Sequence, residues 1–143
     1  MSAVATLTLA EYDQLWHDWR AMGVTEEEQI ERVAGALADC AVRVALPNPE
    51  LPIVVLAGQG RKGAVGMAAV RLLADQGVSV RLVLSTSPTV LTPVAATQYQ
   101  ILQECGILAW GLSMSQAEID AQEPIEWLSV ALIVDALLEG ELP

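Results

Sequence analysis

The stretch from residue 51 to residue 63 reads LPIVVLAGQGRKG, and it decides the fold class. Its first seven residues form a short continuous apolar run, which is typical of a strand buried on both faces of a sheet. The run leads into Gly58-Gln59-Gly60-Arg61-Lys62-Gly63, a Gly-x-Gly-x-x-Gly loop, and a helical pattern follows from Ala64 to about Gln76. A glycine loop between a strand and a helix is typical of a Rossmann-like α/β unit.

The same alternation continues along the chain. Further strands are predicted at 78–84, 107–110 and 128–134, the last ending at Asp135, with helices between them. Strands that alternate with helices pair in parallel through right-handed crossovers. We therefore predict a three-layer αβα Rossmann-like sandwich with a parallel sheet of about four strands in the order 3-2-1-4.

A helical lead-in, residues 1–46, precedes this α/β body, which spans 51–143. Thr8 with Glu11 and Thr25 with Glu28 each form a capping box, the sequence signature of a helix start. Apolar residues recur at helical spacing behind both. Two N-terminal helices are expected, and the 143 residues are expected to form one domain.

The composition excludes several classes of protein. The net charge of −11 repels phosphate backbones and argues against nucleic acid as a partner. No apolar run approaches the roughly 18 residues of a membrane span, and the N-terminus lacks the basic start of a signal peptide. The protein is therefore expected in the cytoplasm. Cys40 and Cys105 share no metal-like spacing and are expected to be reduced packing residues, and His17 a solvent-facing helix residue.

A sheet of this strand order opens a crevice between strands 1 and 4, at their carboxyl ends. The Gly58 loop follows strand 1 and Asp135 follows strand 4, so the two are predicted to meet there. Asp135 has two interpretations, either a ligand of an ion or substrate, or a polar residue that caps the next turn.

The chemistry of the loop indicates an anion. Glycines allow a tight turn and close backbone approach, and a helix N-terminus offers free N–H groups. The second strand is followed by Ser85-Thr86, without the acid that holds a ribose in dinucleotide dehydrogenases, which disfavours ordinary NAD binding. The predicted ligand-binding residues are Gly58, Gly60, Arg61, Lys62, Gly63, Ser85 and Thr86. A glycine-rich turn without a ligand is the alternative.

Two segments carry a resemblance to a known family. The stretch from Val54 to Gly60, with Gly63 and Gly66 behind it, resembles the nucleotide-site segment of the NAD(P)H-hydrate epimerases, the YjeF N-terminal domain family. The final stretch from Ile133 to Leu138 resembles the second motif of that family, and the two lead-in helices fit as well. The resemblance covers essentially the whole chain.

The resemblance implies an isomerase that interconverts the epimers of hydrated NADH and NADPH, on an αβα fold that is often dimeric and holds a potassium ion. The family loop reads Gly-x-Gly-Asn-Asn-Gly-Gly-Asp-Gly, whereas Arg61, Lys62 and Val65 stand here in place of the asparagines and the aspartate. Lys62 replaces an asparagine that helps to hold potassium, and Asp135 matches the aspartate at the ion site. We hypothesise that the Lys62 ammonium takes the place of the ion and pairs with Asp135, which is also the best candidate for a catalytic residue.

After Asp135 the family runs on through a Phe-Gly-Thr-Gly-Leu turn and further strands, whereas this chain has Leu138-Glu139-Gly140-Glu141-Leu142 and stops. The strand at 128–134 would then expose an edge, so pairing with another copy or with a partner chain is expected. Three functions remain open. The first is a divergent epimerase-like module that binds a nucleotide or phosphate-bearing ligand. The second is an active isomerase completed by a second chain, and the third is a ligand-free interaction module.

Overall fold

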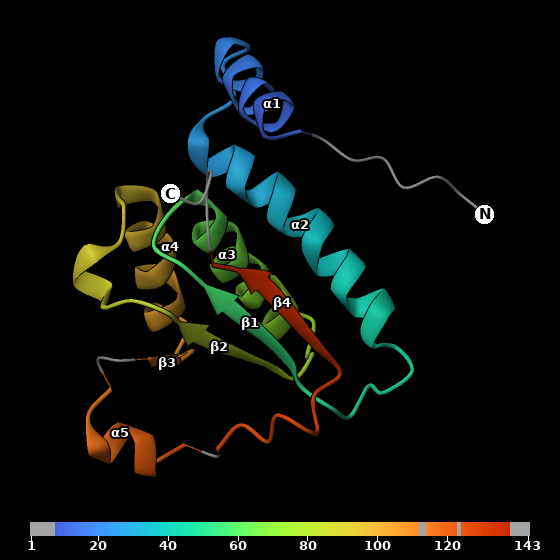
Figure 1. Ribbon diagram of the computed structural model, residues 1–143, viewed down its shortest axis with the longest axis vertical. Coiled ribbons are helices and arrows are strands. Elements are labelled where there is room, and N and C mark those ends of the chain that lie inside the picture. The colour runs from blue at the N-terminus through green and yellow to red at the C-terminus, as the bar shows by residue number, and fades with distance from the viewer. Residues whose placement is uncertain (1–7, 112–113, 123, 138–143) are drawn as a thin grey trace.

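The computed structural model describes residues 8–111, 114–122 and 124–137 of the chain. It contains one parallel sheet, in which β1 (Ile53–Ala57) and β2 (Val80–Leu84) lie between β3 (Ala109–Gly111) and β4 (Leu132–Ala136) (Figure 1). The strand order is β3-β2-β1-β4, and Val55 of β1 lies opposite Leu82 on one side and Val134 on the other. The predicted Rossmann-like fold and strand order are confirmed.

Three helices cover one face of the sheet. The central one is α3 (Arg61–Asp75), which packs between α2 (Glu26–Ala45) and α4 (Pro93–Glu104). Every residue of α3 from 63 to 70 is buried, because this helix touches the sheet on one side and a helix on each flank. Alternate strand residues point into this core, among them Ile53, Val55, Ala57, Leu82 and Leu84.

The connection from β3 to β4 runs on the other face, as a right-handed crossover in the reverse direction along the sheet requires. It contains the short helix α5 (Gln116–Asp120), which begins with a capping box between Ser115 and Glu118. The hydrogen bond from the Ser115 backbone N–H holds the pKa of Glu118 below its usual value. Beyond α5, Pro124 and Ile125 line a pocket together with Val83 of β2 and Trp110 of β3. This connection therefore lies over β2 and β3 on the second face, whereas Ile133 and Asp135 of β4 are exposed there.

The lead-in forms two helices, as predicted, each starting at the expected threonine. Thr8 caps α1 (Leu9–Ala21), and Thr25 and Glu28 form the capping box of α2. Figure 1 shows α1 beyond the N-terminal end of α2, away from the sheet. None of the described helices is long and apolar enough to cross a membrane.

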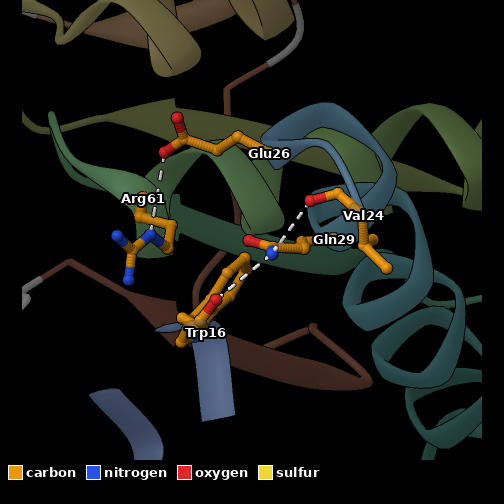
Figure 2. Close-up of polar contacts among 5 residues, drawn as sticks. All are labelled: Trp16, Val24, Glu26, Gln29 and Arg61. Carbon is orange, nitrogen blue, oxygen red and sulfur yellow. Dashed lines mark hydrogen bonds and ion pairs between the residues drawn. The ribbon is translucent and has the colours of Figure 1, made fainter. Parts of the chain in front are cut away.

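A buried tryptophan and a buried glutamine fix α1 to the rest of the protein. Trp16 is only 3% exposed and belongs to the main core. The Gln29 side chain is fully buried, and its Nε2 donates to the carbonyls of Trp16 (3.3 Å) and Val24 (3.4 Å) (Figure 2). The α1–α2 turn is thus hydrogen-bonded from inside the protein, so the lead-in is part of the same packed unit.

Several boundaries differ from the sequence prediction, among them the start of the second strand, which was expected at Val78 and lies at Val80. The fourth strand was expected at 128–134, but β4 begins at Leu132, since its neighbour β1 begins at Ile53 and Pro52 has no N–H to extend the ladder. Leu128 is fully exposed in a turn in which the Ser129 N–H donates to the Glu126 carbonyl (2.8 Å). The third strand, expected at 107–110, is short and lies at 109–111.

The start of α3 differs as well. The helix begins at Arg61 and not at Ala64, because Gly60 already serves as the N-cap. Cys40 and Cys105 are both exposed free thiols, so the prediction that they pack in the core is wrong. His17 is exposed, as expected. The predicted features after Leu137 lie outside the described residues.

Two isoleucines test how unevenly stability is distributed. Ile30 of α2 is fully buried in the core, whereas Ile133 of β4 is 47% exposed. Ile30→Ala should lower the free energy of unfolding by about 2–5 kcal/mol, since it removes buried methyl groups and leaves a cavity. Ile133→Ala should cost less than about 1 kcal/mol. Urea denaturation of both variants measures the difference, and equal losses would contradict the assignment of the core.

Candidate functional site

The loop after β1 ties together the carboxyl ends of three strands. The Gly58 N–H donates to the carbonyl of Ala136 at the end of β4 (2.9 Å). The Ser85 N–H, just after β2, donates to the carbonyl of Ala57 (3.0 Å). The loop therefore lies at the predicted crevice, and its backbone is held from both sides.

The protein's own backbone occupies the space next to two of the glycines. A Cβ on Gly58 would overlap the Leu137 carbonyl, and a Cβ on Gly63 would overlap the Gly58 carbonyl. Gly66 is also tight, since its Cβ would lie 2.9 Å from the Ala136 Cβ. These glycines are required for α3 to pack closely on β1 and β4. The Leu137 carbonyl lies next to Gly58, on the β4 side of the loop.

The N-termini of α3 and α4 lack the side-chain cap that begins the other described α-helices. The side chains of Thr8, Thr25 and Ser115 accept backbone N–H groups at the starts of α1, α2 and α5. Gly60, the N-cap of α3, has no side chain that could do so. The first N–H groups of an α-helix have no partner within the helix, and together with the helix dipole they favour an anion.

Lys62 adds a positive charge at this helix start. It is the only lysine of the chain, it is exposed, and it lies in the first turn of α3. The remaining basic residues of the chain are six arginines against 18 acids, so positive charge is scarce on this protein. The N–H and ammonium groups here suit a phosphate and do not fit a potassium ion, which takes oxygen ligands.

Two threonine hydroxyls adjoin the loop. Thr86 follows Ser85, and the Thr92 N–H donates to the Gln59 carbonyl (3.0 Å). Both Oγ1 atoms are buried, and neither has a hydrogen-bond partner among the residues that the structure describes. An unpaired buried hydroxyl costs about 1–3 kcal/mol, which makes these groups candidates for contact with a ligand. Thr86 is among the ligand-binding residues predicted from the sequence, whereas Thr92 is not. Thr92 is the N-cap of α4, and its side chain makes no capping hydrogen bond.

Arg61 faces the lead-in helices. Its guanidinium carbon lies 4.5 Å from the centre of the Trp16 ring, and its Nε lies 3.8 Å from Glu26 Oε1 (Figure 2). A cation over a tryptophan face is stabilised by the ring's charge distribution. Arg61 therefore joins α3 to α1 and α2, although sequence reasoning placed it in the ligand site.

Asp135 lies inside β4, and its side chain is on the face of the sheet opposite α3, because its neighbours Val134 and Ala136 face that helix. It is exposed, and its Oδ1 accepts a hydrogen bond from the Leu137 N–H (3.1 Å). This contact is the turn-capping one of the two alternatives. In the described part of the chain no ion pair joins Asp135 to Lys62, and no group of three or more potential metal ligands occurs.

The chain is similar to known proteins in both sequence and structure. Residues 26–140 match the model of a family described as YjeF-related protein N-terminus. The structure is similar to the crystal structure of yeast ynu0 (YNL200c), with a TM-score of 0.74 and 16% identity over 98% of this chain. At this identity the likeness shows the fold alone, and this chain spans 60% of the yeast chain. No curated protein matches the chain.

A pair of glycine substitutions tests the packing at the loop. Gly63→Ala should lower the free energy of unfolding by more than about 2 kcal/mol, because a backbone atom must move to admit the methyl group. Gly35 of α2 is the control, since nothing lies within 4 Å of a Cβ there. Gly35→Ala should raise stability by about 0.5–1 kcal/mol through helix propensity. Denaturant midpoints measure both, and a Gly63→Ala variant as stable as Gly35→Ala would contradict this packing.

Proposed function

The chain belongs to the YjeF-related N-terminal family, and we propose that it is a divergent member that binds a nucleotide or another phosphate-bearing ligand at the start of α3. The observation that carries the proposal is the uncapped N-terminus at Gly60 together with exposed Lys62. We propose the cytoplasm as the location, as the sequence predicts.

Charge supports a local and specific anion site. A chain with a net charge of −11 repels a phosphate at long range, so binding needs strong local donors. Backbone N–H groups at Gly60–Gly63 and the Lys62 ammonium are such donors. Hydrogen bonds to charged groups contribute about 1.5–3 kcal/mol each, more than neutral ones.

Hydroxyl groups extend the site toward β2. Ser85 is exposed at the end of this strand, and the buried Thr86 and Thr92 hydroxyls have no hydrogen-bond partner among the described residues. Rotation of a threonine side chain on ligand binding would give its hydroxyl a phosphate or ribose oxygen as a partner. Because the Leu137 carbonyl lies next to Gly58 and the hydroxyl groups follow β2, we propose that the ligand binds between the α3 N-terminus and the end of β2.

We propose that the chain by itself lacks standard NAD(P)H-hydrate epimerase activity. The resemblance assigns nucleotide and ion binding to loop side chains that are replaced here by Arg61, Lys62 and Val65. Arg61 is engaged with Trp16 and Glu26, and Asp135 bonds to the Leu137 N–H. Asp135 is still the best candidate for a catalytic group.

One observation favours a second chain as a partner. In the described sheet β4 is an edge strand, and its Ile133 side chain is 47% exposed. An apolar edge strand is a template for pairing. We propose that another copy or a partner chain pairs along Leu132–Ala136, a shorter segment than the 128–134 edge expected from sequence. Such a partner could also complete an active isomerase, which is the alternative function. A ligand-free scaffold is the outcome if nothing binds the loop.

Lys62→Gln tests the ligand site, with Arg43→Gln as a matched control that removes the same charge from the exposed C-terminal part of α2. A ligand at about 100 times its Kd adds about 2.7 kcal/mol to the folded state, and thermal unfolding with phosphate, AMP, ADP-ribose and NADP should reveal it. We expect Lys62→Gln to weaken the binding of the active ligand by about tenfold, or about 1.4 kcal/mol, and Arg43→Gln to leave it unchanged.

Two results would contradict the proposal. The absence of any thermal shift with all four compounds would favour the scaffold. Epimerisation of hydrated NADPH by the chain alone would show that the replaced side chains are dispensable, and would make it an active isomerase.

A further inference from the structure

A pocket of about 510 Å³ lies on the face of the sheet opposite α3. Its floor is formed by the carboxyl ends of β2 and β3, with Val83 and Trp110 paired across the two strands. Pro124, Ile125 and Trp127, from the connection to β4, form the opposing wall. Pockets that hold small organic ligands measure about 300–1,000 Å³, so this one is of suitable size.

Two tryptophans line this pocket from separate parts of the chain. Trp110 is partly buried, and the Arg81 guanidinium lies 5.6 Å from the centre of its ring, a cation–π contact from the neighbouring strand. Trp127 is 50% exposed at the pocket. A half-exposed tryptophan at the edge of an apolar pocket costs hydration free energy unless a ligand covers it.

The polar groups of the pocket are few. Trp110 Nε1 is buried and has no hydrogen-bond acceptor among the described residues. A tryptophan N–H usually has a partner when it is buried, so a small tilt of this ring toward a ligand acceptor would satisfy it. Exposed Ser85 also lines the pocket, with its hydroxyl group as a donor or acceptor. The combination favours a flat ring with hydrogen-bonding nitrogen or oxygen atoms over a purely aliphatic ligand.

We infer that this pocket binds a nucleobase, a planar nitrogen heteroaromatic ring stacked on Trp110 or Trp127. Stacking of a base on an aromatic side chain changes affinity by about 5- to 150-fold and tolerates different bases. Trp110 Nε1 would donate to a ring acceptor, and Ser85 would contact a polar edge of the base or the sugar.

The position of Ser85 links this pocket to the phosphate site. Its N–H donates to the carbonyl of Ala57, the residue before Gly58, so Ser85 lies between the pocket and the loop. A nucleotide would then extend from the two tryptophans, past Ser85, to the α3 N-terminus. Only this joining of the two sites rests on the proposed function, since the pocket's own contacts do not involve the loop.

The test uses the full chain and two separate probes. Adenosine has the ring without phosphate, and inorganic phosphate has the anion without a ring. Binding of each is measured by calorimetry in wild type, Trp127→Ala, Trp110→Phe and Lys62→Gln, with Trp19→Ala of α1 as the aromatic control. Urea midpoints of all variants show whether each is folded. If Trp127→Ala proves unstable, Trp110→Phe still tests the pocket, because it retains an aromatic ring.

Adenosine binding should fall at least about tenfold in Trp127→Ala and about fivefold in Trp110→Phe, and stay unchanged in Lys62→Gln and Trp19→Ala. Phosphate binding should fall in Lys62→Gln and stay unchanged in the three tryptophan variants. If the wild type binds adenosine but not phosphate, the proposed loop site is overturned and the pocket is left intact. No adenosine binding by the wild type, or equal binding by all the variants, would overturn the inference. A dimer that dissociates in Trp127→Ala, without adenosine binding, would identify the pocket as an interface between copies and would overturn it as well.

Discussion

The arrangement of the site depends on a backbone contact between Gly63 of α3 and the carbonyl of Gly58 at the end of β1. No side chain fits between them, so the start of the helix rests directly on the end of the strand. Gly66, one turn further, leaves room for the side chains of Val55 and Ala136. Through these contacts α3 lies near β1 and β4, and all of its residues from 63 to 70 are buried. The position of the helix N-terminus at the strand edge follows from this packing.

The same constraint changes what the glycine motif says about function. Packing alone requires Gly58 and Gly63, so their presence does not indicate a ligand. The features that packing leaves unexplained are Gly60, which gives the helix no side-chain cap, and exposed Lys62 in the first turn. Arg61 is neither a packing glycine nor an exposed group at the helix start, since it joins α3 to Trp16 and Glu26. Residues of one motif thus differ in their surroundings. Gly63 packs against backbone, Arg61 contacts α1 and α2, and Lys62 is exposed.

Sequence patterns predicted the strand order and the place of the loop, because alternation and crossover handedness leave few topologies. They could not predict which face of β4 carries Asp135. Side chains alternate along a strand, so its face depends on the register with β1, which begins at Ile53 opposite Leu132. Because the apolar run begins at Leu128, the sequence pattern does not show that the strand starts only at Leu132. Trp110 and Trp127 were also not associated, because they are far apart in sequence and Trp127 lies in an irregular segment.

The central claim is that the start of α3 binds a phosphate group, and amide NMR of the ¹⁵N-labelled chain during a titration with inorganic phosphate tests it most directly. We predict saturable shift changes concentrated at residues 60–64. The start of α2 is an internal reference, because Thr25 and Glu28 cap it and Glu26, Glu27 and Glu28 repel an anion there. Absence of changes at 60–64, or equal changes at both helix starts, would contradict the claim.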